Sequence, residues 1–497
     1  MREHLPILVV MLPLAGAVVV PVLGLASARA ARGLSLGALL LAHLASLAAL
    51  RVAVETGVWR YELGGWAAPW GIEYVVDPLA GAMAALVSLM ALLSAVYAGP
   101  HLEGRGGAAG LYLALHLLLT AGLLGIVLAG DVFNLYVFLE ISSLSAYALL
   151  AAEGGRASVA AFRYLLVGTI AASFYLLGIG YLYAITGTLN MADLAARLPE
   201  APEAGVVATA VALIVVGLAI KTAVFPLHGW LPDVYSYAPA PVVAFVASVM
   251  SKVSAYVLLR FLFFVLEGRD AASRALDLLG VAGAAAVVAG SVMALAQRDL
   301  RRMLAYSSVG QMGYVVLGLG LGNAAGLTGA LLHVVNHAVM KGCLFMAGGN
   351  VLRRAGTARI PDYAGMAGRL PLTMAAFVVA ALSMIGLPPT GGFFSKWYLI
   401  LGALERGAWV YVAAIVASSL LTAAYFFRIL ESAYFRSPAT GPAPAGGEDR
   451  PAEGRFEAPP AMLVPVLVLG LGVLALGVFN QSLVEGVILP ALAPGGR

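Results

Sequence analysis

The chain is dominated by long apolar runs that alternate with short polar or charged stretches. A helix needs roughly 20 mostly apolar residues to cross the hydrocarbon core of a bilayer, and runs of that length recur along the whole chain. The pattern predicts about 14 membrane-spanning helices. They are expected at 5–25, 34–54, 78–98, 111–130, 132–152, 160–185, from 206 to a break after Lys221, 241–266, 276–296, 303–321, 327–348, from 371 across a break at 386–392, 408–429 and 461–479.

Three of the polar stretches carry a local prediction. Residues 55–77 contain aromatic residues, paired glycines and acids, which indicates a hairpin at the membrane interface. The acidic loop after the sixth span, TGTLNMADLAARLPEAPEAG, has the composition of a short helix. Arg428 and Glu431 are spaced i, i+3 at the end of the thirteenth span, a spacing that predicts a local ion pair.

Composition agrees with an all-α polytopic membrane protein. Apolar residues make up 62% of the chain, charged residues only 11%, and the mean hydropathy is +0.95. The net charge of +4 is small and the basic residues are scattered, which excludes a nucleic-acid-binding surface. Cys343 is the only cysteine, so a disulfide framework, an iron–sulfur cluster and a CxxC redox motif are excluded. We therefore expect no cofactor, and any electrons would pass through other proteins.

The arginines predict an orientation. Of 29 basic residues four are Lys, so 25 are Arg. When the loops are assigned alternately to the two sides, one side holds fourteen loop arginines and the other holds seven. Because cytoplasmic loops carry the excess of positive charge, we expect both termini to lie outside in the inner membrane of a prokaryotic cell.

The four lysines, in contrast, all lie in apolar segments. A lysine at the centre of a bilayer costs about 2.5 to 3.5 kcal/mol, so such residues face a protein-lined or water-lined interior. An amine away from water can release its proton, whereas a guanidinium stays protonated. One such lysine could simply bind helix-end carbonyls or an anionic neighbour; four together indicate proton transfer. The lysines are Lys221, Lys252, Lys341 and Lys396.

Two spans carry breaks that expose backbone groups. The chain is organised around the stretch 220–253, where prolines remove backbone donors and prevent a straight helix. A second break, GLPPTGG at 386–392, precedes Lys396 by about one turn. The freed carbonyls need protein or water partners. The auxiliary residues of the two breaks are Pro226, His228, Pro388 and Pro389.

The order of spans and breaks predicts an internal repeat. Spans four to eight and nine to thirteen each comprise five crossings, and the broken span is the fourth of each set. A unit with an odd number of crossings that is repeated in tandem has the opposite orientation in the membrane the second time. Carriers whose transport site lies near the membrane midplane have such inverted repeats. The expected division is an N-terminal three-helix segment at 1–110, repeats at 111–266 and 274–435, a flexible Pro/Gly-rich loop at 436–460 and a C-terminal helix at 461–497.

Other titratable groups lie in the middle of spans. Glu140 is the one carboxylate placed deep in the membrane, as a partner of a lysine or as a protonated core residue. His333, His337 and Lys341 are spaced i, i+4 and i+8, which stacks them on one helix face. We interpret this stripe as a proton relay rather than structural core histidines. A metal site is disfavoured because no carboxylate ligand or HExxH pattern accompanies the histidines.

Five segments together resemble the antiporter-like subunits that are shared by Mrp-type sodium/proton antiporters, membrane-bound hydrogenases and respiratory complex I. The resemblance covers nearly the whole chain. The segments are DVFNLYVFLEISSLSAYALL, KTAVFPLHGWLPDVYSYAPAPVVAFVASVMSKV, DLRRMLAYSSVGQMGY, HVVNHAVMKG and GLPPTGGFFSKWYLI. It implies an ion pair between Glu140 and Lys221, and a central hydrophilic axis through Lys252, His333, Lys341 and Lys396.

The resemblance also implies a function. We expect a proton-translocating subunit of a multisubunit cation/proton antiporter, similar to the D-type subunit of Mrp antiporters. Its partners would be other membrane subunits, protons, Na⁺ and the lipid bilayer. The alternative is a proton-pumping membrane subunit of a hydrogenase or an NADH:quinone oxidoreductase, in which case the parent complex is an oxidoreductase. A standalone carrier for an organic solute is a third interpretation, and it would need a substrate-shaped pocket at the midplane.

Overall fold

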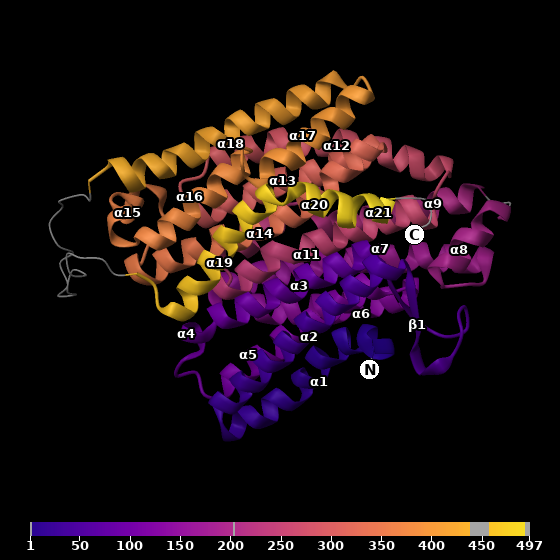
Figure 1. Cartoon of the computed structure of the whole chain (residues 1–497), viewed down its shortest axis with the longest axis horizontal. Helices are drawn as coiled ribbons and strands as arrows, with labels where there is room; N and C mark the ends of the chain where they lie inside the picture. The colour runs from indigo at the N-terminus through magenta and orange to yellow at the C-terminus, as the bar shows by residue number, and fades with distance from the viewer. Residues whose placement is uncertain (1, 202–203, 438–456, 493–497) are drawn as a thin grey trace.

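The protein is a bundle of long helices that run roughly side by side (Figure 1). The computed structural model describes residues 2–201, 204–437 and 457–492. Thirteen helices in this part of the chain are long and apolar enough to cross a membrane. They are α1 (Leu5–Ala26), α2 (Ala28–Thr56), α3 (Pro78–Tyr97), α5 (Gly107–Leu128), α6 (Val132–Leu150), α7 (Gly155–Thr186), α9 (Ala204–Thr222), α11 (Ala240–Arg260, continued as a π-helix to Val265), α12 (Asp270–Leu295), α13 (Leu300–Leu321), α14 (Ala324–Ala355), α18 (Trp409–Phe435) and α19 (Pro460–Val478).

A fourteenth crossing is made by two shorter helices, so the all-α architecture with about 14 spans is confirmed. Helix α16 (Pro371–Ile385) ends at the predicted break, and α17 (Gly391–Glu405) resumes after it. The first break likewise separates α9 from the short helix α10 (Leu231–Tyr237). The broken element is the fourth of five crossings in each half of the bundle. The remaining short helices are α4 (Gly99–Leu102), α8 (Met191–Arg197), α15 (Met366–Arg369), α20 (Asn480–Leu483) and α21 (Leu489–Leu492).

Helices α11, α13 and α14 form the centre of the bundle. In each of them 94% of the most apolar 18-residue window is buried, against 39% in α1, α2 and α19 and 28% in α18. Small residues allow close packing around this centre. A Cβ atom on Gly313 of α13 would lie only 2.8 Å from the Cβ of Ala286 on α12, the kind of approach that glycine permits between membrane helices. Polar groups on the three central helices are therefore shielded from lipid by the rest of the chain.

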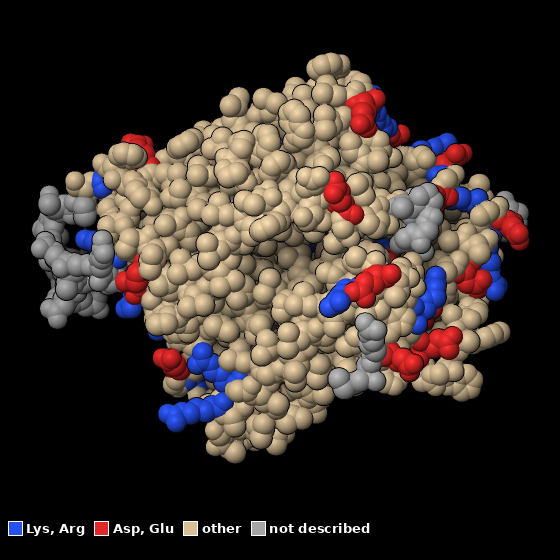
Figure 2. Space-filling model, viewed as in Figure 1, with Lys and Arg blue, Asp and Glu red and all other residues tan. Residues whose placement is uncertain are grey.

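Charged residues gather at two opposite ends of the molecule, and the belt between them is almost entirely uncharged in the view of Figure 2. One end carries the antiparallel strands β1 (Trp59–Glu62) and β2 (Glu73–Val76), in which Trp59 is paired with Val76 and Glu62 with Glu73. This confirms the predicted hairpin, and we call this end the hairpin end. Helices α4 and α15 lie at the opposite end (Figure 1). The apolar belt is what a bilayer-spanning surface requires.

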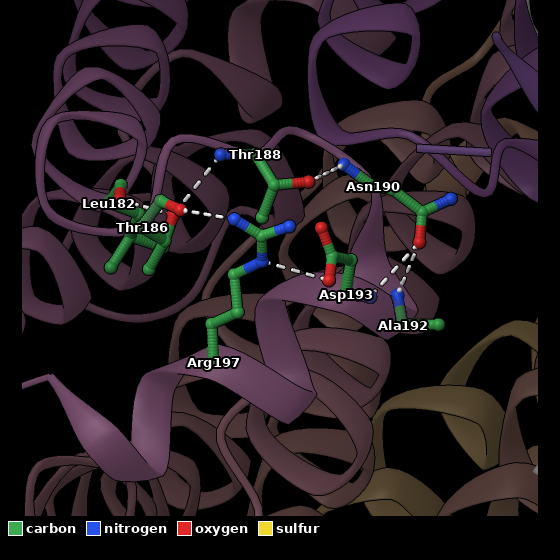
Figure 3. A network of polar contacts seen from close by, with 7 residues as sticks. All are labelled: Leu182, Thr186, Thr188, Asn190, Ala192, Asp193 and Arg197. Carbon is green, nitrogen blue, oxygen red and sulfur yellow. Dashed lines mark hydrogen bonds and ion pairs between the residues drawn. The ribbon is translucent and has the colours of Figure 1, made fainter. Parts of the chain in front are cut away.

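Helix α8 is held at the hairpin end by a network of side-chain to backbone hydrogen bonds (Figure 3). Asn190 caps α8 by accepting from the backbone N–H groups of Ala192 and Asp193, both at 3.0 Å. Arg197 donates to Asp193 at 2.9 Å and to the carbonyl of Thr186 at 3.1 Å. The bond from Arg197 lowers the pKa of the Asp193 carboxyl, so this pair stays charged at neutral pH. The amide of Asn190 also donates to Glu73 of β2 at 2.7 Å, which ties α8 to the hairpin.

The predicted ion pair at the end of α18 is absent among the described residues. Arg428 does not pair with Glu431: it donates to the backbone carbonyls of Leu295 and Gln297, at 3.0 and 2.5 Å, while Glu431 pairs with Arg436 at 2.9 Å. The prediction was wrong because two carbonyls at the end of α12 lie within reach of the guanidinium. Residues 438–456 of the predicted flexible loop lie outside the described residues, and the division of the chain into repeats stays a prediction.

Candidate functional site

All four lysines are buried inside the bundle. They lie on four different helices: Lys221 on α9, Lys252 on α11, Lys341 on α14 and Lys396 on α17. Two of these helices border a break, and the other two belong to the central group. A buried ammonium has to find partners among protein atoms, because an unsatisfied charge in an apolar interior is very costly. The partners found for each lysine define the candidate site.

Lys221 binds hydroxyl groups of α6. Its Nζ donates to Ser143 at 2.8 Å and to the hydroxyl of Tyr147 at 3.3 Å. Glu140 lies on the same helix, three residues before Ser143. Glu140 is partly exposed, and no ion pair within 4.0 Å joins it to Lys221 in the described part of the chain. Direct pairing of these two residues stays a prediction, and the groups that contact Lys221 directly are the hydroxyls of Ser143 and Tyr147.

Aromatic rings connect the Lys221 region to the central helix α11. The ring of Tyr147 meets that of Tyr164 edge to face, with centroids 4.8 Å apart. The hydroxyl of Tyr164 contacts the sulfur of Met250 at 3.6 Å, and Met250 precedes Lys252 by two residues. Tyr147 and Tyr164, which sequence reasoning had not singled out, thus connect Lys221 to α11, the helix that carries Lys252.

Lys252 and Lys341 occupy the centre of the bundle. Lys252 is fully buried and donates to the carbonyl of Ala247 on its own helix. Lys341 is also fully buried; it donates to the carbonyl of Leu304 at 2.7 Å and to the hydroxyl of Ser307. Helices α11 and α14, which carry these lysines, pack against each other. Because the two helices come from different predicted halves, their contact joins the two halves.

The predicted stripe on α14 continues from Lys341 through two stacked imidazoles. The rings of His333 and His337 lie 5.9 Å apart at 22°. His333 contacts Ser395 through Nδ1 at 2.8 Å and Gln311 through Nε2 at 2.9 Å. Neither ring nitrogen of His337 has a hydrogen-bond partner among the described residues. Helix α14 therefore carries titratable groups from the centre of the bundle towards α17.

Lys396 closes the second break. Its Nζ donates to the carbonyls of Met384 and Ile385, at 3.0 and 2.9 Å, and to the hydroxyl of Ser419 at 3.0 Å. Those carbonyls belong to the last turn of α16, where helix geometry leaves acceptors without intrahelical donors. The ammonium also lies over the ring of Tyr314, 4.8 Å from its centroid. Lys396 thus binds helix-end carbonyls, which a purely structural role would require. It also follows Ser395, whose hydroxyl contacts His333.

The two breaks are stabilised by different side chains. At the first, the indole of Trp230 donates to the carbonyl of Ile220 at 3.0 Å, and the ring of His228 stacks on Phe225 at 5.3 Å. At the second, the amide of Asn336 on α14 donates to the carbonyl of Gly391 at 2.7 Å. Pro226, Pro388 and Pro389 lie in the connecting segments, where they prevent helical continuity as predicted.

The predicted titratable side chains form a series across the bundle, and all of them except the partly exposed Glu140 are buried. In order they are Glu140, Lys221, Lys252, Lys341, His337, His333 and Lys396. Hydroxyls and amides that sequence reasoning missed fill the spaces between them: Ser143, Tyr147, Tyr164, Ser307, Gln311 and Ser395. Ser143, Tyr147 and Ser395 share a helix with a predicted residue, which is the only advance signal for them. Tyr164, Ser307 and Gln311 lie on α7 and α13, which carry none of the predicted residues. Within the described ranges, no three His, Cys, Asp or Glu side chains gather as metal ligands would. Amine and imidazole groups bind and release protons, so a series of this kind can transfer protons.

The chain is similar to known proteins in both sequence and structure. The family model described as NADH:quinone oxidoreductase/Mrp antiporter, transmembrane, matches residues 129–422. A protein named NADH-quinone oxidoreductase subunit N, from Desulforudis audaxviator, is 56% identical over 99% of both chains. The D-type subunit of a Na⁺/H⁺ antiporter from Alkalihalophilus pseudofirmus is 32% identical over 77% of both chains. Among solved structures, a chain of the Mrp complex from Dietzia sp. DQ12-45-1b superimposes with a TM-score of 0.88 and 29% identity, covering 99% of this chain and 97% of that one.

Proposed function

The chain belongs to the NADH:quinone oxidoreductase/Mrp antiporter transmembrane family, and we propose that within it the chain is a proton-translocating subunit of a quinone-reducing complex, similar to subunit N. The observation that supports this branch is the 56% identity to a subunit N along practically the entire chain. The identity to the D-type antiporter relative is 32%, over a shorter part of the chain. This ranking reverses our preference from sequence motifs, which was the D-type subunit of an Mrp antiporter, and Na⁺ transport is no longer part of the proposal.

Proton movement in this proposal follows the buried series of lysines and histidines. A lysine amine can bind and release a proton, and the hydroxyls beside Lys221 and Lys341 can pass one on. His333 contacts the hydroxyl of Ser395 through Nδ1 and the amide oxygen of Gln311 through Nε2, so Nδ1 is the nitrogen that can exchange a proton on the side of Ser395. His337, whose nitrogens have no partner among the described residues, lies between His333 and Lys341. The series then ends at Lys396.

The driving reaction would take place in other subunits. With a single cysteine and no CxxC motif, this chain has none of the sequence patterns that hold iron–sulfur clusters. In this proposal the chain moves charge across the membrane. Moving one elementary charge through a potential difference of 100 mV changes its free energy by about 2.3 kcal/mol. Other membrane subunits of the complex would flank the bundle and link it to the redox reaction.

The test is to isolate the complex through an affinity tag on this chain and to reconstitute it in vesicles. We expect quinone oxidoreductase subunits to copurify, and we expect proton translocation that requires quinone reduction but no Na⁺. The matched control is Lys341→Met in the same complex, which should still reduce quinone but translocate fewer protons. Copurification of antiporter subunits, with proton movement driven by a Na⁺ gradient alone, would overturn the proposal in favour of the Mrp branch.

A further inference from the structure

Helix α11 carries a stripe of polar residues that leads from Lys252 to the hairpin end. Lys252, Tyr256 and Arg260 are spaced i, i+4 and i+8, so they share one helix face. Each step of four residues advances about 6 Å along the helix. Arg260 is the last residue of α11 and lies inside the candidate span 240–265. The stripe thus covers the two helical turns between Lys252 and the end of α11 at the hairpin end.

Arg260 is held in place by a closed set of contacts. Its Nε donates to the hydroxyl of Tyr256 at 2.8 Å, and its Nη2 forms an ion pair with Asp77. The guanidinium also lies over the rings of Tyr256 and Phe264, with centroids at 5.1 and 4.6 Å. The Asp77 side chain is 1% exposed and that of Arg260 is 12% exposed.

The partners of Arg260 are themselves fixed to the scaffold. The second oxygen of Asp77 caps α3 by accepting from the backbone N–H of Ala80 at 2.7 Å. The hydroxyl of Tyr256 donates to the carbonyl of Val127 on α5 at 2.9 Å. The guanidinium is therefore positioned by three helices, α3, α5 and α11, which keeps it at one place along the stripe.

A partly open cleft of about 250 Å³ lies directly against these residues at the hairpin end. Tyr256, Arg260 and Phe264 line one side of it, and Met191 and Ala192 of α8 line another. The network in Figure 3 holds this α8 wall in place. The cleft extends to Tyr256, which is one helical turn from Lys252. A proton that left Lys252 in this direction would have only a short distance to travel before it reached the cleft.

We propose that Arg260 is an electrostatic seal that prevents protons on Lys252 from escaping along α11 into this cleft, an inference that rests on the proton axis proposed above. A guanidinium stays protonated in proteins, so it cannot accept a proton and pass it on. Its fixed positive charge also repels an approaching proton, which is how an arginine excludes protons from some membrane pores. Asp77 keeps the charge at the point where the path meets the cleft.

Arg60 provides a matched comparison. It lines the same cleft and is also paired with a buried carboxylate, Glu73, at 2.7 Å. It lies on β1, away from the stripe on α11. If the only role of such a pair were to hold the hairpin end together, Arg60 and Arg260 would be equivalent. The seal predicts that only Arg260 controls proton leakage.

The test is the passive proton conductance of vesicles that contain the assembled complex, with no redox substrate and no Na⁺ gradient. We expect Arg260→Met to collapse an imposed pH gradient faster by roughly tenfold or more, the size of effect that a local charge has on ion encounter. Arg60→Met should remain as tight as the unmodified complex. Arg260→Lys should leak, because a lysine amine, unlike a guanidinium, can release a proton and bind another. Adding Lys252→Met to Arg260→Met should remove the leak, because the path then has no proton source.

A second variant keeps the test valid if Arg260→Met does not assemble. Arg260→Cys is made in a Cys343→Ser background and treated with thiol reagents of similar size. A cationic reagent should close the leak, and a neutral one should leave it open.

A tight Arg260→Met complex, or equal leaks in Arg260→Met and Arg60→Met, would overturn the seal. Because the assay uses neither NADH nor quinone, its result does not depend on which branch of the family the complex belongs to. A failure of the proposed function appears separately, as proton translocation that is driven by a Na⁺ gradient alone.

Discussion

Lys396 closes the carbonyl end of α16: its Nζ lies 2.9 Å from the backbone oxygen of Ile385 on the other side of the second break. The lysine therefore stabilises the broken helix and also stands at the end of the proposed proton series. These two roles can be separated by substitution, because only one of them requires release of a proton. The same distinction applies to every lysine of the series.

For Lys396 we predict different effects of two substitutions. Lys396→Met leaves the carbonyls of Met384 and Ile385 without a donor, and a buried unsatisfied polar group costs about 1–3 kcal/mol. The variant should lose both thermal stability and proton translocation. Lys396→Arg keeps donors near the break, so it should lose translocation with a smaller loss of stability. Thermal unfolding of the purified complex and proton flux in vesicles measure the two effects; full flux in the Arg variant would contradict the assignment.

For Lys252 and Lys341 we predict that charge alone is not sufficient. Lys252→Arg and Lys341→Arg keep a buried positive charge but remove the ability to release the proton. Each should abolish proton translocation in reconstituted vesicles, while the complex still assembles. As a control, Arg51→Lys exchanges the same two residue types in an exposed pair with Glu55 and should have no effect. Unchanged flux in both Arg variants would show that these lysines do not carry protons.

The contacts of Lys221 predict that Ser143 couples it to Glu140. We expect Glu140→Ala and Lys221→Ala each to impair translocation, and the double variant to lose less than the sum, because an interacting pair gives a non-additive cycle. Ser143→Ala should weaken this coupling, since its hydroxyl is the nearest partner of Lys221 at 2.8 Å. The measurement is proton flux for every member of the cycle. Strictly additive losses would argue against coupling between Glu140 and Lys221.

Helix α19 packs directly on the second break, and Gly477 makes this contact possible. A Cβ atom at position 477 would overlap the carbonyl oxygen of Pro389. Gly477→Ala should therefore push α19 away or distort the break, with a cost of about 1–3 kcal/mol from overpacking. On the same helix, a Cβ at Gly472 would meet Val339 at 3.4 Å, an ordinary contact. Thermal unfolding should show a lower midpoint for Gly477→Ala than for Gly472→Ala, and equal midpoints would refute this packing role.

The amino-acid sequence alone is sufficient to predict the number of spans, the positions of both breaks and the charged residues inside the membrane. The physical reason is that a bilayer imposes a length of roughly 20 apolar residues on each crossing and a high cost on each buried charge. Both constraints act locally, so they are visible in a single sequence. Proline acts locally as well, which is why the breaks beside Lys221 and Lys396 were found without a structure.

The sequence does not predict which side chains contact one another across the bundle. The packing of α11 against α14, the contact of His333 with Ser395 and the hydroxyl partners of Lys221 all join helices that are not neighbours in the chain. Their spacing within each helix carries no information about the rotation of that helix against its neighbours. Arg428 illustrates the same limit, because it donates to two carbonyls, of Leu295 and Gln297, while its sequence neighbour Glu431 pairs with Arg436. Side-chain partners in a helix bundle are set by packing, and packing depends on the whole chain.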